Sequence, residues 1–288
     1  MAGIAPHAGF RIGHVTRTEE RTGVTVLLFD APTMTAAEVR GAAPGTRDLE
    51  LLKPGMLGQS TDAIVLTGGS TFGLRTVDGA LGQLAADGRG TTFGGVVIPL
   101  VCGAVVFDLA NGSPTVPEVE DGAAAVRNAL PVERVEIGRV GAGTGVRWGH
   151  LRTDGPSPGG FGIGQIRLPE GIVTAVAVVN ALGSVRAASP DVRTEFLERL
   201  SDSQQAGENT TLVAVVTDIE CSHGDLVRLC IAGHDGLSNA IVPAHTMFDG
   251  DVVFTSTTNT GSIDPNNLLR LFIATELAVE AAIGQAIQ

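Results

Sequence analysis

The segment "ENTTLVAVVTD", residues 208–218, places polar residues directly before an apolar run. The run Leu212–Val216 is rich in β-branched residues, which predicts a buried strand. Polar residues before a strand usually form a turn, so an ordinary turn at 209–211 is one interpretation. The other interpretation is chemical, because Thr210 would be held at the start of a rigid strand.

A threonine hydroxyl is a weak nucleophile unless a base accepts its proton, and an N-terminal residue carries its own base. That base is the α-amino group, which has a pKa of about 7.7–8.0. If the peptide bond between Asn209 and Thr210 were cut, Thr210 would gain this amine. The hydroxyl could make the cut itself by attacking the Asn209 carbonyl, which gives an ester that water hydrolyses. The preceding segment, 186–209, is polar and charged, as in a linker or a surface helix.

Other apolar, β-branched runs that end in turn-forming residues predict buried strands at 62–70, 94–109 and 172–182. Apolar residues at helical spacing predict amphipathic helices at 72–88, 121–130, 225–241 and 264–287. The last helix is expected to begin with Asp264 as N-cap and Pro265 at its first position. After them, apolar residues recur at helical spacing at Leu268, Leu269, Phe272, Ile273 and Leu277. The chain is thus predicted to be an α/β protein with sheets buried on both faces.

The composition limits the class of protein and its partners. Of the 288 residues, 43% are hydrophobic and only 17% are charged, and the mean hydropathy is +0.25. This balance suits a many-layered domain or a subunit of an oligomer. The net charge of −12 argues against nucleic-acid and anionic-membrane partners, which bind basic patches. No apolar run approaches the roughly 20 residues that span a bilayer.

Cofactor sites and export signals are not expected either. The start of the chain has no cationic segment followed by an apolar core, so the prediction is a cytoplasmic protein without a secretory signal. The three cysteines lack the spacing of a disulfide framework or a structural zinc site. No two histidines have metal-ligand spacing on one helix face, and His223, His234 and His245 are predicted to be core or turn residues. The glycine-rich segment 140–149 has Val146 where a dinucleotide-binding motif needs its last glycine.

Four further regions of sequence favour the chemical interpretation of Thr210. They are "LTGGSTFGL" (66–74), "VGAGTG" (140–145) with "GGFGIG" (159–164), "VAVVNALGSV" (176–185) and "AGHDGLSNAIVPAHTMFDGDVVF" (232–254). Together they resemble the self-cleaving DmpA-type aminopeptidases and β-peptidyl aminopeptidases, and among these the nylon-oligomer (6-aminohexanoate-oligomer) hydrolases look most similar. The resemblance implies a four-layer αββα sandwich, with one domain over 1–288. It also implies self-cleavage into a long α chain (1–209) and a short β chain (210–288).

The resemblance also implies a set of active-site residues. Thr210 takes the place of the nucleophile, and Thr211 is a weaker candidate because it would point to the opposite face of the strand. Asp249 and Asp251 match the acidic pair of the nylon-oligomer hydrolases; the alternative is a surface turn with solvated aspartates. Asn180 matches the amide of the oxyanion hole, where a neutral donor stabilises a tetrahedral oxyanion; the alternative is an asparagine that caps a turn.

Two positions depart from the family pattern. His150 stands where the family hydrolases usually have lysine, and Phe107 stands where they often have tyrosine. The His150 imidazole could replace the lysine as a hydrogen-bond donor, although it is only partly charged at neutral pH. The Phe107 side chain cannot donate at all. These departures leave three functions open: an amide hydrolase, an acyltransferase of the ornithine acetyltransferase type, and a non-catalytic oligomeric member of the family.

For the hydrolase, the resemblance implies a small peptide, a β-peptide or an aminoalkanoate oligomer as substrate. It implies no cofactor, and it implies a tetramer of the cleaved α/β pairs. The acyltransferase would form the same acyl-enzyme and differ only in the acceptor, which would be an amine instead of water.

Overall fold

The segment that begins at Thr210 forms β14 (Thr210–Thr217), a strand that is buried along its whole length. It pairs antiparallel with β12 (Gly171–Asn180) on one side and parallel with β16 (Val252–Thr257) on the other. β11 (Phe161–Leu168) adds the outer strand beside β12. The arrangement is that of a computed structural model, which describes residues 4–111, 114–186, 188, 193, 197 and 209–288.

The longest strand, β2 (Thr22–Val39), links two layers of sheet. Its first half pairs with β1 (Phe10–Arg17) and β4 (Ser60–Thr67), and its second half pairs with β16. The register between β2 and β4 shifts between Leu28 and Thr33, as at a β-bulge, where a strand bends and its twist increases. β2 therefore carries the chain from one layer to the other.

The two layers pack face to face through an apolar core. One layer contains β11, β12, β14 and β16. The other contains β1, the first half of β2 and β4, and β7 (Val101–Val105) extends this layer by pairing parallel with β4. Both layers supply large, fully buried side chains to the space between them, among them Phe10, Phe29, Ile64, Phe161, Leu212 and Phe254. The strands are apolar on both faces because helices cover their outer sides as well.

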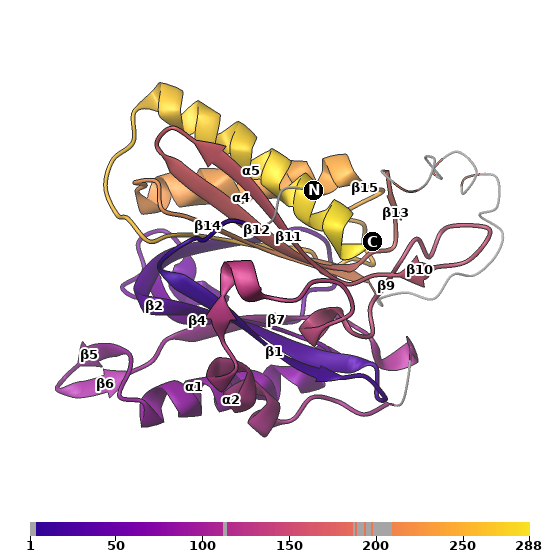
Figure 1. Cartoon of the computed structure of the whole chain (residues 1–288), viewed down its shortest axis with the longest axis horizontal. Helices are drawn as coiled ribbons and strands as arrows, with labels where there is room; N and C mark the ends of the chain where they lie inside the picture. Colours follow the sequence, from indigo (N-terminus) through magenta and orange to yellow (C-terminus); the bar gives the residue numbers. More distant parts are fainter. Residues whose placement is uncertain (1–3, 112–113, 187, 189–192, 194–196, 198–208) are drawn as a thin grey trace.

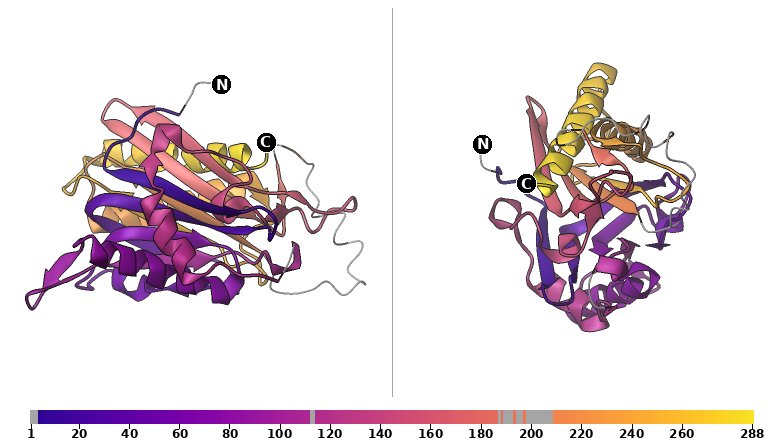
Figure 2. Two further views of the ribbon diagram at one scale, coloured as in Figure 1. Left: turned by 60° about the horizontal axis from the view of Figure 1, so that its bottom comes forward. Right: turned by 90° about the vertical axis from the view of Figure 1, so that its right-hand side faces the viewer.

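Helices cover the two outer faces of the sheets (Figures 1 and 2). α1 (Arg75–Ala86) and α2 (Val119–Arg127) pack on the layer of β1, β2, β4 and β7. α4 (His223–Ala240) and α5 (Pro265–Ala286) pack on the layer of β11, β12, β14 and β16. The order of layers is helix, sheet, sheet, helix, so the predicted four-layer αββα sandwich is confirmed.

Short strands make local contacts outside these elements. The β5–β6 pair forms a hairpin that projects from the body of the protein (Figure 1). The short strands are β3 (Thr46–Arg47), β5 (Thr91–Phe93), β6 (Val96–Ile98), β8 (Leu130–Pro131), β9 (Arg147–Trp148), β10 (Ser157–Pro158), β13 (Ser184–Val185) and β15 (Ile241–Val242).

One predicted strand, 94–109, is wrong in its first part. The side chains of β6 are exposed, and the chain breaks at Pro99 before the buried strand β7 begins. Proline has no backbone N–H for a sheet hydrogen bond, so it interrupts the ladder. The remaining predicted strands and all four predicted helices are present close to their expected bounds. The linker predicted at 186–209 lies almost entirely outside the described residues.

α5 begins as predicted, since the Asp264 side chain accepts from the N–H of Asn266 and Pro265 is the first helical residue. Its buried face, however, consists mainly of small residues. A Cβ atom at Gly164 of β11 would lie 2.1 Å from the carbonyl oxygen of Ala278, so helix and strand approach closely only because both residues are small. Leu271 and Ile283 are also buried on this face, whereas Leu269, Ile273 and Leu277 are 60%, 48% and 47% exposed.

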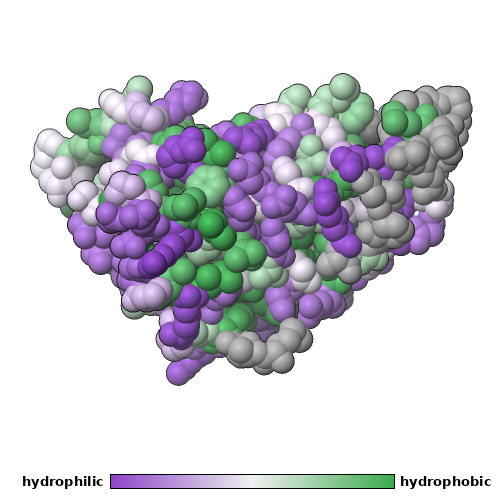
Figure 3. Space-filling model, turned by 90° about the horizontal axis from the view of Figure 1, so that it is seen from above, coloured by the Kyte–Doolittle hydropathy of each residue, from purple (hydrophilic) through white to green (hydrophobic). Residues whose placement is uncertain are grey.

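The surface on the α5 side of the molecule mixes hydrophobic and hydrophilic residues (Figure 3). Among the described helices, none is both long enough and apolar enough to cross a membrane. The prediction of a cytoplasmic location stays a prediction.

Candidate active site

The ends of neighbouring strands bring the predicted site residues together at the start of β14. Thr210, the first residue of β14, is the register partner of Asn180, the last residue of β12. On the other side, Asn209 forms a parallel bridge with Asp249, just before β16. The side chains of these four residues are all buried. Three segments that are distant in the sequence, around residues 180, 210 and 249, thus meet at one end of these neighbouring strands.

The peptide bond between Asn209 and Thr210 lies in a hydrogen-bonded setting. The Asn209 carbonyl oxygen accepts a hydrogen bond from the Thr210 hydroxyl at 2.6 Å and another from the backbone N–H of Gly250 at 3.0 Å. The hydroxyl is therefore in contact with the carbonyl group that it would attack. The N–H of Gly250 points at the oxygen on which negative charge would develop during such an attack.

Gly250 also leaves space for the hydroxyl. A Cβ atom at this position would lie 2.8 Å from Oγ1 of Thr210 and 2.4 Å from the carbonyl oxygen of Ala43. Both distances are shorter than Cβ contacts in real proteins, and the second atom belongs to the backbone, which cannot move aside easily. A residue without a side chain is thus required between the two aspartates.

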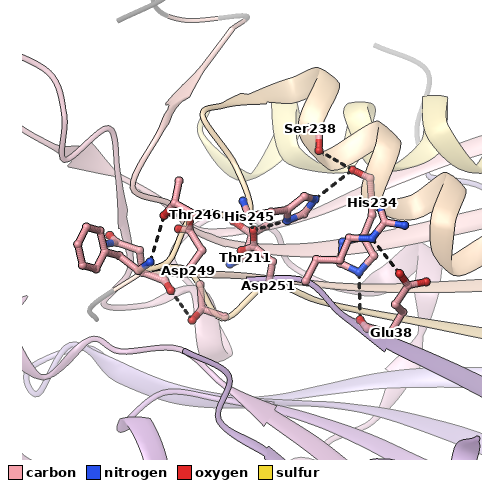
Figure 4. A network of polar contacts seen from close by, with 12 residues as sticks. Glu38, Thr211, His234, Ser238, His245, Thr246, Asp249 and Asp251 are labelled. Atoms are coloured by element: carbon pink, nitrogen blue, oxygen red, sulfur yellow. Dashed lines mark hydrogen bonds and ion pairs between the residues drawn. The ribbon is translucent and has the colours of Figure 1, made fainter. Parts of the chain in front are cut away.

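Asp251 is held by three N–H groups, two of them from one residue (Figure 4). Its Oδ1 accepts from the backbone N–H of Thr211 at 2.7 Å. Its Oδ2 accepts from His245 twice, from the backbone N–H at 3.1 Å and from Nδ1 at 2.8 Å. An ionised carboxylate can only accept hydrogen bonds, so Nδ1 of His245 is assigned as the donor. Asp251 is 2% exposed, and these donors fix the position of its carboxyl group.

Asp249 has different partners and a different acidity. Its Oδ2 accepts from the Thr246 backbone N–H at 2.8 Å and from the Thr246 hydroxyl at 2.6 Å. Burial, and then the negative charge of Asp251, raises the pKa of Asp249 to about 6, although hydrogen bonds from Thr246 and from the backbone of Leu182 oppose this shift. A carboxyl group with this pKa can exchange a proton near neutral pH.

Neither carboxylate contacts the Thr210 hydroxyl directly in the uncleaved chain, as far as the hydrogen bonds between described residues go. Asp251 binds the backbone of the next residue, Thr211, and Asp249 lies beside Asn209. The aspartates are buried, so they are not solvated residues of a surface turn.

The Asn180 side chain is oriented by two backbone groups. Its Nδ2 donates to the carbonyl oxygen of Phe107 at 3.1 Å, and its Oδ1 accepts from the N–H of Arg147 at 3.1 Å. Phe107, which stands where relatives often have tyrosine, thus contributes its carbonyl group to the site. These contacts fix the amide next to the start of β14.

His150 lies near the candidate site and is connected to it through its two neighbours in the sequence. The residues on either side of it bind the segment that follows Asn180: the N–H of Gly149 donates to Ala181, and the N–H of Leu151 donates to Leu182. Burial, and then the positive charge of Arg147, lowers the pKa of His150 below its usual value of 6.5. The imidazole is therefore neutral at pH 7 and cannot replace the charge of a lysine. Its Nε2 is buried without a hydrogen-bond partner among the described residues.

Three residues of this site were not identified from the sequence: His245, Thr246 and Gly250. His245, predicted to be a core or turn residue, lies in a bend before the two aspartates, where its ring and its backbone N–H both bind Asp251. His234, predicted in the same way, is a buried core residue whose ring packs edge-on against that of His245 at 4.8 Å. The sequence signal was available, since "HT" precedes the two aspartates by a few residues in 232–254.

The described residues contain no group of three or more histidine, cysteine, aspartate or glutamate side chains that could hold a metal ion. The arrangement can instead support acyl transfer to a hydroxyl group, because it combines a hydroxyl, a backbone N–H at the carbonyl oxygen and a carboxyl group with a pKa near neutrality.

Comparison with known proteins gives a consistent assignment. The family model of peptidase family S58 matches residues 4–288. An uncharacterized aminopeptidase of Mycobacterium bovis is 33% identical over 316 aligned residues, which cover 99% of this chain and 90% of that protein. A 6-aminohexanoate-oligomer endohydrolase of a Kocuria species is 31% identical over 271 residues, which cover 87% of this chain and 73% of that protein.

Solved structures share the fold. The β-aminopeptidase of a Burkholderia species matches with a TM-score of 0.77 at 20% identity, covering 99% of this chain and 88% of that one. An L-aminopeptidase D-Ala-esterase/amidase of Ochrobactrum anthropi, described as a variant of the Ntn hydrolase fold, matches with a TM-score of 0.69 at 17% identity, covering 99% and 87%. The predicted resemblance to the DmpA-type aminopeptidases is therefore confirmed, and the chain belongs to peptidase family S58.

Proposed function

We propose that this protein is a self-processing amide hydrolase whose nucleophile is Thr210. In the first step, Oγ1 of Thr210 attacks the carbonyl carbon of Asn209, and the amide nitrogen of Thr210 leaves as an amine. Water then hydrolyses the ester. The products are a chain of residues 1–209 that ends in the carboxylate of Asn209 and a chain of residues 210–288 that begins with a free α-amino group.

One observation carries this proposal: the Asn209 carbonyl oxygen accepts hydrogen bonds from both the Thr210 hydroxyl and the Gly250 N–H. The first supports Thr210 as the nucleophile, because its hydroxyl contacts the carbonyl group of the bond to be cut. The second supports Gly250 as the donor that would stabilise the oxyanion. An ordinary turn needs neither of these contacts.

The carboxyl pair would transfer the proton from the hydroxyl to the departing amide nitrogen. Asp249 is suited to exchange protons, because its pKa is raised to about 6. Asp251 is held in place by three N–H groups. After cleavage, Asp251 beside the start of β14 would orient the new α-amino group of Thr210. That amine would then act as the base for the hydroxyl during turnover.

During turnover, Asn180 would supply an amide N–H to the substrate oxyanion, in keeping with its place opposite Thr210. His150 would offer a neutral ring with an unpartnered Nε2 to the substrate, since its lowered pKa leaves it uncharged. The substrates would be small peptides, β-peptides or aminoalkanoate oligomers, by similarity to relatives named aminopeptidase and 6-aminohexanoate-oligomer endohydrolase.

The cleaved pairs would assemble into a tetramer. Exposed apolar side chains support an assembly of this kind: they line β6 on the projecting hairpin and the outer side of α5 at Leu269, Ile273 and Leu277. Sedimentation of the purified protein measures the number of subunits, and a monomeric species at micromolar concentration would contradict this part of the proposal.

The decisive test is processing of the purified protein. On a denaturing gel, the wild type should separate into fragments of residues 1–209 and 210–288, whereas Thr210→Ala should run as one intact chain. Thr211→Ala is the matched control and should still be cut. A wild-type chain that stays whole after long incubation would contradict the proposal, because Thr210 would then lack the α-amino group that acts as its base.

Product analysis separates hydrolysis from acyl transfer. The cleaved protein is incubated with an amide substrate, with and without ornithine as an amine acceptor. Free acid as the main product in both reactions supports the hydrolase, and acylated ornithine would favour the transferase. Failure to release any product would favour a non-catalytic member of the family.

A further inference from the structure

A cavity of about 140 Å³ is lined by three arginines, Arg21, Arg139 and Arg147. Within the described part of the chain, its other lining residues are Asn111, Gly145, Val146 and Pro158, so no acidic side chain lines it. The protein carries a net charge of −12, and its acidic residues outnumber its arginines and lysines by 31 to 19. A cavity lined by three arginines is therefore contrary to the overall charge.

The guanidinium groups are positioned but not neutralised. None of the three arginines takes part in an ion pair between two described residues. Each binds a backbone carbonyl instead: Arg21 that of Asn111 at 2.9 Å, Arg139 that of Thr144 at 3.2 Å, and Arg147 that of Pro156 at 2.5 Å. A carbonyl holds a guanidinium group in place without cancelling its charge.

Donors remain for a ligand. Each guanidinium carries five N–H groups, and the carbonyl contacts use only one or two of them. Nε of Arg147 is buried and has no partner among the described residues. Burial without a partner is costly for a charged donor, and an anion in the cavity would remove that cost.

The cavity adjoins the candidate active site through Arg147. The backbone N–H of this residue donates to Oδ1 of Asn180, whose register partner is Thr210. The same residue lines the cavity. A substrate bound at Asn180 would therefore have this cavity close to one of its ends.

We propose that the arginine pocket, formed by Arg21, Arg139 and Arg147, binds the free carboxylate at one end of the amide substrate. The inference rests on the proposed function and narrows its substrate class to short amides that end in a carboxylate. Guanidinium groups bind carboxylates through paired, charge-assisted hydrogen bonds. Phosphate shares this chemistry, but the substrate of an amide hydrolase commonly carries a carboxylate, which favours the latter.

The kinetic test compares β-alanyl-β-alanine with its C-terminal amide. We expect the wild type to show a KM at least tenfold lower for the acid than for the amide. In Arg21→Gln/Arg139→Gln, the KM of the acid should rise about tenfold while that of the amide stays unchanged. Arg228→Gln, which removes an equal charge from an exposed position on α4, is the control and should behave as the wild type. Equal KM values for acid and amide in the wild type would overturn the inference.

A binding test is independent of activity. Calorimetry on the uncleaved Thr210→Ala chain uses butanoate, butanamide and inorganic phosphate as probes. Butanoate should bind and butanamide should not, the double arginine variant should weaken butanoate binding at least tenfold, and Arg21→Lys/Arg139→Lys should retain it. Binding of phosphate alone, or butanoate binding that the double variant leaves intact, would contradict the proposal. If the wild type never cleaves itself but butanoate still binds in this way, the proposed function fails and the pocket stands.

Discussion

The two sides of Thr210 differ in charge and in the groups they offer. The side towards β16 holds the buried carboxyl groups of Asp249 and Asp251 with the N–H of Gly250. The side towards β12 offers the uncharged amide of Asn180 and, behind it, the cationic side chain of Arg147. We therefore propose that proton transfer and self-cleavage depend on the groups on the β16 side, whereas recognition and turnover of substrate depend on those on the β12 side.

On the β16 side, we expect the largest loss of self-cleavage from a substitution at Gly250. In Gly250→Ala, the new Cβ atom would lie 2.4 Å from the carbonyl of Ala43 and 2.8 Å from Oγ1 of Thr210, so the nucleophile must shift. We expect the rate of self-cleavage, followed on denaturing gels, to fall by a factor of about a hundred or more. Gly82→Ala on α1, where a Cβ would meet nothing within 4 Å, is the control and should be cut at the wild-type rate.

Asn180→Ala should separate the two sides. On the cleaved enzyme, we expect turnover of an amide substrate to fall by a factor of about a hundred or more, because one oxyanion donor is lost. Self-cleavage should fall much less, since the Asn209 carbonyl already has the N–H of Gly250 as a donor. Circular dichroism checks that the fold is retained. Turnover at the wild-type level would show that Asn180 is not an oxyanion donor. An equal loss in substrate turnover and in self-cleavage would show that the two sides of Thr210 do not have separate functions.

His245 tests how the β16 side is held in place. His245→Ala removes the Nδ1 donor to Asp251, so we expect self-cleavage to slow by a factor of about ten, with a changed dependence on pH. His245→Asn is the matched variant, because its amide N–H can take the place of Nδ1. Asparagine also tolerates the left-handed backbone at this position, where φ is 57°. The same rate and the same pH profile in both variants would show that His245 does not position Asp251.

The smallest expected effect is a pH dependence of stability. The pKa of Asp249 is raised to about 6 in the folded protein, so the folded state holds this proton more tightly than the unfolded state does. The contribution of Asp249 to stability is therefore fully present below the unfolded pKa of about 3.9 and is lost as the pH rises through about 6. Chemical denaturation of the Thr210→Ala chain between pH 4 and 7 measures this loss. Asp249→Asn should remove that part of the dependence, and an identical profile in both proteins would contradict the shift.

The sequence predicted those parts of the structure that depend on local pattern. The apolar run after Thr210 predicted β14, and the order Asp264–Pro265 predicted the start of α5. Patterns failed where packing was decided by a distant partner. On α5, Leu269, Ile273 and Leu277 recur at helical spacing but are exposed, because the helix backbone at Ala278 lies close against Gly164 of β11 elsewhere on its surface.

The sequence proposed residues for the candidate site, but it did not predict the hydrogen bonds between them. The family resemblance named Thr210, Asn180 and the two aspartates, and the fold brings them together. It did not indicate that His245 binds Asp251, or that the backbone N–H of Gly250 joins the Thr210 hydroxyl at the Asn209 carbonyl. Such contacts depend on backbone geometry between separate strands, and one sequence does not encode that geometry in any local pattern.

The central claim is that Thr210 cuts the chain before itself and becomes an N-terminal nucleophile. N-terminal sequencing of the short fragment from purified wild-type protein tests it most directly. The expected result is a fragment that begins Thr-Thr-Leu-Val, together with an intact mass that corresponds to residues 210–288. A folded protein that yields only the start of the full chain, or a fragment that begins at any other residue, would contradict the claim.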